Sequence, residues 1–264
     1  VFRHSMQPLY DLLHWLDGYR PGAKPEPIPN RTDVKEFHRL GVALQQAVER
    51  SEELFERQSQ FIGNASHELQ TPLAIITNRV EWLLDQPTIT EQEAGELVKI
   101  QSTLSRAVRL NKTLLLLTKI DNGQFPESAE VNLAQMIRDA LEGYGDIYAS
   151  HEVQLTHSLP ASFVVEMNES LASTLISNLI KNLYVHTPQG GAANISIAGR
   201  TLRVRNAGEA PLDKEHIFER FYQGSRKRGS TGLGLALVAA ICRNYNLRLE
   251  YSYANGEHCF EVEF

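Results

Sequence analysis

The sequence predicts an α+β protein of several domains: a helical coiled coil, a dimeric antiparallel four-helix bundle made from two helical hairpins, and an α/β sandwich. Three observations support this prediction. Apolar residues recur every seven positions through the N-terminal half, and two long helical segments flank a proline turn near residue 87. Alternating, strand-like runs begin only after residue 130.

Composition agrees with this class and excludes others. The chain has 264 residues, of which 42% are hydrophobic and 22% are charged, as in ordinary globular proteins. Its net charge of −6 disfavours nucleic acid as a partner. Cys242 and Cys259 lack metal-ligand spacing, so we expect reduced packing residues. No apolar run is long enough to cross a bilayer, yet we expect a membrane anchor and sensor before Val1, which is not a methionine.

Residues 1–55 are predicted to form two helices joined by a proline-rich, extended connector between Gly18 and Arg31. The second helix shares its seven-residue register with the segment that follows, so we expect one continuous rod. The shared positions are Val48, Phe55, Ile62, Leu69, Ile76 and Leu83.

Residues 61–84 are the segment around which the chain is organised. At about 100° per residue, His67 lies roughly 160° from the apolar seam, so its imidazole is expected to face solvent. Histidine is nucleophilic near neutral pH, and the adjacent Glu68 can accept a ring proton. Thr71 lies one turn further on the same face, and Pro72 removes a backbone donor. Taken alone, this pattern also fits an ordinary solvated helix face.

A return helix is predicted over residues 90–119, because Gln86-Pro87-Thr88 interrupts the first helix. A hairpin over residues 56–122 leaves its apolar seam half covered. We therefore expect a homodimer in which two hairpins bury that seam.

Residues 123–130 read as a polar linker, and residues 131–264 as a mixed α and β domain. Helices are predicted over residues 132–149, 169–184 and 233–244. Strands are predicted over 153–156, 163–166, 194–198, 202–205, 248–253 and 259–264.

Four parts of this second domain suggest a nucleotide site, and one of them is the pair Phe218 and Phe221 beside a flexible basic segment over residues 225–231. Asn178 and Asn182 lie four residues apart on one helix face, and their carbonyl oxygens suit Mg²⁺. Asn206 ends a strand before Gly208, where a polar side chain can bond an adenine edge. A glycine-rich turn then opens a helix, which favours bound phosphate. Its residues are Gly229, Gly232, Leu233, Gly234 and Leu235.

These motifs resemble a known family. The run from Ser66 to Pro72, SHELQTP, resembles the H-box of sensor histidine kinases. The asparagine helix, the strand end at Asn206, the Phe218 and Phe221 pair and the glycine-rich turn resemble, in order, the N, G1, F and G2 boxes of the family's ATP-binding domain. Residues 1–55 resemble a HAMP signal-relay module, although a simple coiled-coil arm is the alternative.

The resemblance implies a cytoplasmic protein-histidine autokinase that uses ATP and Mg²⁺ and is anchored at the membrane. It implies that His67 accepts phosphate, that Glu68 is its general base, and that a response-regulator receiver domain receives the phosphoryl group. Thr71 would orient water when that regulator is dephosphorylated. The remaining implied nucleotide contacts are His186, Phe221, Arg226, Lys227 and Arg228.

The sequence departs from the family at several positions. Asn206 stands where the family usually has Asp, and Val185 and Gln223 replace residues that are often cationic. We hypothesise that the basic residues 226–228 supply the missing charge. The departures leave open a pseudokinase-like scaffold or phosphatase-biased sensor, and a non-kinase ATPase that shares only this domain is a further alternative.

Overall fold

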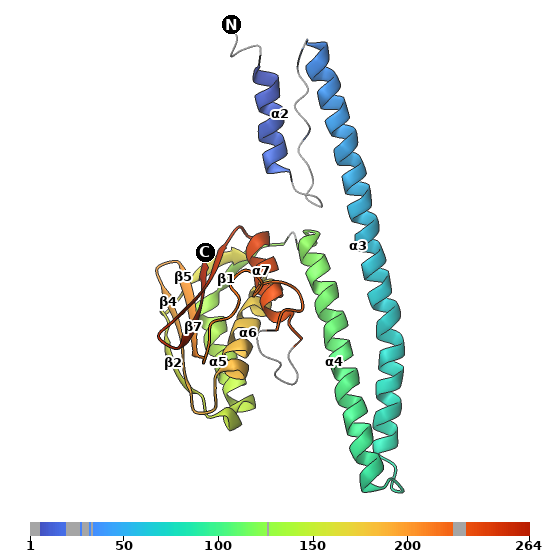
Figure 1. Ribbon diagram of the computed structural model, residues 1–264, viewed down its shortest axis with the longest axis vertical. Coiled ribbons are helices and arrows are strands. Elements are labelled where there is room, and N and C mark those ends of the chain that lie inside the picture. The colour runs from blue at the N-terminus through green and yellow to red at the C-terminus, as the bar shows by residue number, and fades with distance from the viewer. Residues whose placement is uncertain (1–5, 20–26, 28–31, 33, 126, 224–230) are drawn as a thin grey trace.

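The computed structural model describes residues 6–19, 27, 32, 34–125, 127–223 and 231–264. A long helical hairpin runs down one side, and an α/β domain lies against its second helix (Figure 1). The helices are α2 (Gln7–Gly18), α3 (Lys35–Leu84), α4 (Glu91–Asp121), α5 (Leu133–Ile147), α6 (Glu169–His186) and α7 (Gly234–Asn244), with a 3₁₀ turn, η1 (Ala149–His151). The strands are β1 (Ala129–Asn132), β2 (Gln154–Ser158), β3 (Val164–Met167), β4 (Ala192–Ala198), β5 (Thr201–Ala207), β6 (Arg248–Ala254) and β7 (Glu257–Glu263).

Helix α3 confirms the predicted continuous rod. It runs for 50 residues and passes through Pro72, which corresponds to about 75 Å at 1.5 Å per residue. Helix α2 lies beside its N-terminal part, and the Tyr19 hydroxyl donates to Glu52 at 2.6 Å. Most of the predicted proline-rich connector lies outside the described residues.

Helix α4 begins with a reciprocal cap that its sequence encodes. The Thr90 hydroxyl accepts from the Glu93 backbone N–H, and the Glu93 carboxylate accepts from the Thr90 backbone N–H. The predicted hairpin therefore forms, with α4 running antiparallel to α3 (Figure 1).

The C-terminal half of the predicted apolar seam of α3 is uncovered within one chain, whereas Val48 near its start is 7% exposed. Leu69, Ile76 and Leu83 are 53%, 45% and 41% exposed, whereas Val80, which faces α4, is 5% exposed. An exposed row of large apolar side chains on a long helix is typical of an interface.

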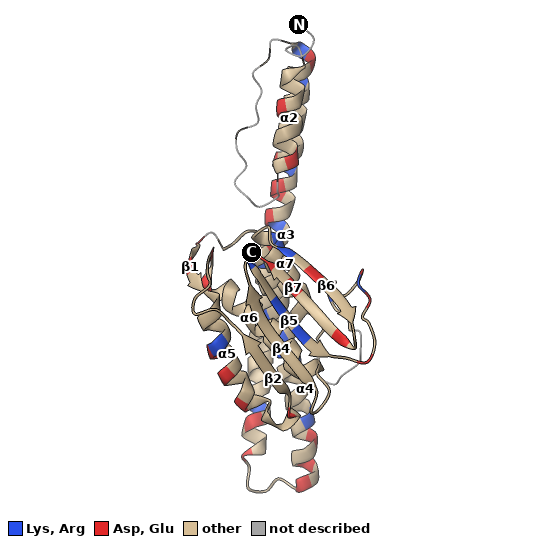
Figure 2. Ribbon diagram, turned by 90° about the vertical axis from the view of Figure 1, so that its left-hand side faces the viewer, with Lys and Arg blue, Asp and Glu red and all other residues tan. Residues whose placement is uncertain are grey.

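The α/β domain contains a five-stranded sheet in the order β2-β4-β5-β7-β6. The β2–β4 pair is parallel and the other pairs are antiparallel. Helices α5, α6 and α7 cover one face, and Figure 2 views the sheet from its other, uncovered face. Alternate residues of β5 and β7 are buried, as expected for a sheet covered on one side.

Strand β1 was not predicted from the sequence. It begins at Ala129, inside the stretch expected to be a linker, and pairs with β3. Four residues are too few to show a clear alternation, and the pairing partner lies more than 30 positions away in the chain. Val131 is buried, so this strand belongs to the domain core.

The domain core extends into the end of the hairpin. Leu117 and Ile120 of α4 are 1% and 2% exposed and join the same apolar cluster as α6 and α7. Cys242 of α7 lies in this cluster, where burial raises the pKa of its thiol to about 12. Both cysteines are free thiols, as expected. None of the helices in the described ranges is long and apolar enough to span a membrane.

Candidate functional site

His67 is exposed on α3, as predicted, and the residue before it is anchored. Ser66 is 4% exposed, and its carbonyl accepts a 2.9 Å hydrogen bond from Asn111 Nδ2 on α4. Asn111 is 9% exposed, so this bond lies between the two helices of the hairpin. A buried, satisfied polar contact fixes the rotation of one helix against the other. His67 is thereby held on the outer side of the hairpin.

Sequence reasoning missed Asn111. A signal was present in the sequence, because this asparagine stands four positions after Ala107 and three before Leu114, at the spacing of one helix face. A polar residue in such a position often specifies register.

Glu68 and Thr71 are also exposed. Thr71 follows His67 by four residues, so the two share a helix face. Pro72 has no N–H to donate, which leaves the Glu68 carbonyl without its usual helical partner. His67 therefore lies on an exposed helical turn that lacks one of its backbone hydrogen bonds.

The glycine-rich turn leads into α7 as predicted. Gly232 has φ +68°, and a Cβ there would come within 2.7 Å of Phe221 C and Tyr222 O. No side chain caps the helix at Leu233. Leu233 therefore leaves the first backbone N–H groups of α7 uncapped, and such groups can bind phosphate oxygens.

Helix α6 packs directly against this turn. A Cβ at Gly234 would lie 3.0 Å from Asn178 Oδ1, while Asn178 Nδ2 donates to the Thr174 carbonyl at 2.8 Å. Asn182 and His186 follow at four-residue intervals and are half-buried. The predicted asparagine helix and glycine-rich turn therefore meet.

The predicted site offers Mg²⁺ only neutral oxygen ligands from the protein. The described residues hold no cluster of three or more His, Cys, Asp or Glu side chains that could bind a metal ion. Asn178 and Asn182 supply amide oxygens, and Mg²⁺ commonly takes its other ligands from water and phosphate. The Mg²⁺ assignment stays a prediction.

Asn206 lies near the end of β5, and Gly208 follows that strand directly. Asn206 is 2% exposed, and its Nδ2 donates to the Ala207 carbonyl at 3.1 Å. A Cβ at Gly208 would collide with the His258 ring, at 2.0 Å from Nε2. Glycine is required at this position because a histidine, which sequence reasoning did not single out, fills the adjacent space.

Phe221 begins the segment that leads to the glycine-rich turn. It has φ +67°, is 57% exposed, and donates its N–H to the Gly232 carbonyl at 2.9 Å. A positive φ is uncommon for a bulky residue and marks a constrained backbone. The predicted contacts Arg226, Lys227, Arg228 and Gly229 lie outside the described residues.

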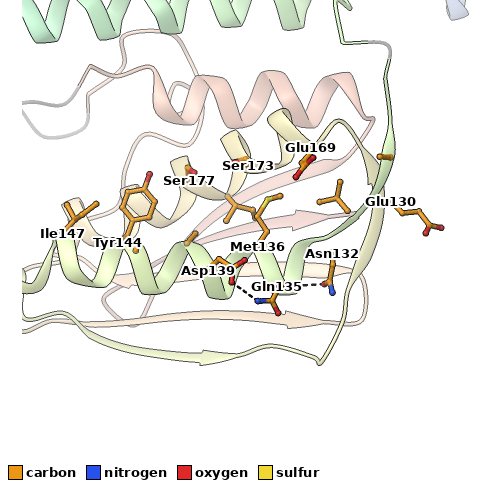
Figure 3. A pocket seen from close by; sticks show the side chains of 15 residues that line it. Glu130, Asn132, Gln135, Met136, Asp139, Tyr144, Ile147, Glu169, Ser173 and Ser177 are labelled. Carbon is orange, nitrogen blue, oxygen red and sulfur yellow. Dashed lines mark hydrogen bonds between the residues drawn. The ribbon is translucent and has the colours of Figure 1, made fainter.

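A separate groove of about 650 Å³ lies between α5 and α6, beside β1 (Figure 3). Met136, Tyr144 and Ile147 give it an apolar side, and Gln135 bonds Asp139 at its rim. It borders Ser173 and Ser177 of α6, whereas the predicted nucleotide residues of that helix are Asn178, Asn182 and His186.

Two family descriptions match the chain. "His Kinase A (phospho-acceptor) domain" matches residues 57–123, and "Histidine kinase-, DNA gyrase B-, and HSP90-like ATPase" matches residues 167–264. The first match contains His67, and the second contains α6, β5 and α7, which carry most of the predicted nucleotide residues.

The chain is similar in sequence to proteins described as sensor histidine kinases. Sensor histidine kinase RppB of Synechocystis sp. is 32% identical over 77% of this chain and 48% of its own length. Probable sensor histidine kinase TcrY of Mycobacterium tuberculosis is 32% identical over 89% of this chain and 53% of its own. The chain thus spans about half the length of these relatives. Full-length ShkA in complex with AMPPNP has the same fold, with a TM-score of 0.61 at 20% identity over 77% of this chain and 45% of ShkA.

Proposed function

Because the chain belongs to the sensor histidine kinases of two-component systems, we propose that it transfers the γ-phosphoryl group of ATP to its own His67. One observation carries the proposal. An exposed histidine stands on a helix whose rotation is fixed by the Asn111–Ser66 bond, and an ATPase-type domain packs against the same hairpin.

The chemistry follows from the side chains around His67. An unprotonated ring nitrogen attacks the γ-phosphorus, the bond from that phosphorus to its bridging oxygen breaks, and ADP leaves. The other ring nitrogen gives up its proton to the Glu68 carboxylate. Because His67 and Glu68 are both exposed, they are available to a domain that approaches from outside the hairpin.

The nucleotide would lie between α6 and the N-terminus of α7. Free N–H groups from Gly232 onward would bind phosphate oxygens, and Asn178 and Asn182 would hold Mg²⁺. When bound, Mg²⁺ neutralises phosphate charge during transfer. The basic residues 226–228 are proposed to add positive charge, since Val185 and Gln223 carry none.

The domain organisation and partners are part of the proposal. Residues 1–55 act as a HAMP-like relay, 56–122 as the dimerisation and phosphotransfer hairpin, 123–130 as a linker and 131–264 as the ATP-binding domain. The exposed seam through Leu69 and Ile76 is covered by a second copy.

The phosphoryl group then passes to an aspartate of a response-regulator receiver domain, and Thr71 orients water when that regulator is dephosphorylated. This region lies at the cytoplasmic face of a membrane in which the whole protein is anchored.

Incubation with γ-labelled ATP and Mg²⁺ tests the proposal. We expect acid-labile, base-stable label in the wild-type chain and none in His67→Gln. His38→Gln, which changes another exposed histidine of α3, serves as the matched control and should label normally. Label that persists in His67→Gln would contradict the proposed acceptor. A wild-type chain without label would instead favour the scaffold or phosphatase-biased alternative, which the neutral Asn206 and Gln223 suggest.

A further inference from the structure

Asn206 and His258 lie directly opposite each other on strands β5 and β7. Both side chains face the helices, because Asn206 is two positions from the buried Val204 and His258 is two positions from the buried Phe260. They are 2% and 8% exposed. Directly paired residues on one sheet face have Cβ atoms about 4.5–5.5 Å apart. The two polar groups therefore form one unit at the end of β5, beside Gly208.

The hydrogen bonds of Tyr251 determine which His258 nitrogen carries the proton. The Tyr251 hydroxyl accepts from the Leu212 backbone N–H at 2.9 Å and lies 2.9 Å from His258 Nδ1. Among the described residues, Nδ1 is the only acceptor recorded for the hydroxyl proton. Burial lowers the pKa of His258, so the ring is neutral. Nδ1 is therefore the acceptor, and the ring proton is on Nε2.

The Nε2 side of the His258 ring lies against Gly208. Nε2 and Cδ2 face Gly208, where a Cβ would lie only 2.0 and 2.3 Å away. Within the described ranges, no protein group accepts a hydrogen bond from Nε2. This atom is nevertheless not completely buried, so a ligand atom can reach it. Gly208 thus leaves open a donor that any other residue would cover.

Asn206 supplies the complementary acceptor. Its Nδ2 donates to the Ala207 carbonyl, which leaves Oδ1 without a recorded protein donor in the described part of the chain. An N–H donor beside a carbonyl acceptor matches adenine, where a ring-nitrogen acceptor adjoins the 6-amino donor. Guanine presents the reverse pattern at N1 and O6, so the pair discriminates between the two bases.

We propose that His258 is a base-reading residue, which donates from Nε2 to the adenine ring nitrogen beside the amino group, N1 or N7, while Asn206 Oδ1 accepts from that amino group. The inference rests on the proposed ATP site. Tyr251 is a positioning residue, because it acts only through the His258 ring.

Equilibrium binding of ADP, 1-deaza-ADP and 7-deaza-ADP to the whole 264-residue chain tests the proposal. These nucleotides cannot donate a γ-phosphoryl group, so binding is measured without turnover. We expect one deaza analogue to bind about 3- to 10-fold more weakly than ADP, as for one lost neutral hydrogen bond. His258→Leu should weaken ADP binding by the same factor and should abolish the difference in affinity between ADP and that analogue. His258→Gln, which keeps an N–H donor, should retain part of it.

Tyr253→Phe is the matched control. It removes a hydroxyl that donates to the Gly208 carbonyl at 3.1 Å but leaves the Tyr251–His258 bond intact, so discrimination should persist. If His258→Leu weakened the binding of ADP and of both analogues by the same factor, the role of His258 would be structural and the inference would be wrong. If the wild-type chain bound none of the three, the proposed nucleotide site itself would fail, and the inference with it.

Discussion

The carboxylate of Asp121, the last residue of α4, lies 2.5 Å from the guanidinium of Arg220 in the α/β domain. Arg243 of α7 approaches the same carboxylate at 3.8 Å. These ion pairs border the point where Leu117 and Ile120 enter the domain core. Two kinds of contact therefore hold the domain against α4: a buried apolar one and a charged one at its edge.

Asp121→Asn should weaken this docking only modestly. The paired side chains are 33% and 49% exposed, so the loss should not exceed about 1 kcal/mol. Hydrogen exchange of the last turns of α4 should become measurably faster. Glu96→Gln, which removes an exposed pair with Lys99 elsewhere on α4, is the control and should leave that region unchanged. Equal exchange in both variants would show that the apolar contact alone holds the domain.

Glu68→Gln should slow autophosphorylation about 100-fold or more, because the carboxylate that takes the ring proton is replaced by an amide. Thr71→Ala, one turn away on the same face, should label at the wild-type rate but lose activity in dephosphorylating a receiver domain. Single-turnover labelling measures the first effect, and loss of label from a phosphorylated regulator measures the second. Similar labelling rates for Glu68→Gln and Thr71→Ala would exclude Glu68 as the general base.

Replacing Leu69 and Ile76 together by Asp should convert a dimer into a monomer. Both side chains are about half exposed in one chain, and a charge in a covered seam is strongly unfavourable. Light scattering after size-exclusion chromatography measures the mass. Asn78→Asp, on another face of α3, should remain dimeric, whereas dimers of the double variant would place the interface elsewhere.

Gly232→Ala should impair nucleotide binding. The backbone has φ +68°, and the added methyl would come within 2.7 Å of the Phe221 and Tyr222 backbone, so the turn must shift at a cost of about 1–3 kcal/mol. Gly190→Ala is the matched control, since φ is +71° there but no atom lies within 4 Å of the new Cβ. It should cost about 1–2 kcal/mol of stability and leave ADP affinity unchanged.

The stability of the α/β domain should fall with acidification in a way that depends on His258. Burial lowers the pKa of this histidine in the folded chain from 6.5, so the unfolded chain binds the proton first. The contribution of neutral His258 to folding stability is fully present above pH 6.5. It is lost as the pH falls from 6.5 towards the pKa of His258 in the folded chain. Among the described residues, Tyr251 and Tyr253 are the titratable groups whose rings contact the His258 ring, and neither becomes charged in this pH range. Denaturant unfolding should show a smaller pH dependence in His258→Gln than in wild type.

Local patterns predicted much of this structure. The seven-residue spacing predicted α3 as one rod, and the same spacing predicted that His67 faces outward. The asparagine helix and the glycine-rich turn, which the sequence predicted to belong to one site, do meet in the fold. Such patterns can be read because each depends on residues only a few positions apart.

Other features depend on residues that the sequence does not place together. Asn111 bonds Ser66 across 45 positions, Asp121 meets Arg220 across 99, and β1 exists only because β3 lies beside it. By itself, the sequence determined the helical period, the turns and the reactive groups, since local backbone sterics and side-chain spacing govern these. Only the tertiary structure decided which polar groups share a buried contact, because burial and strand pairing bring distant residues together and make unpaired partners costly.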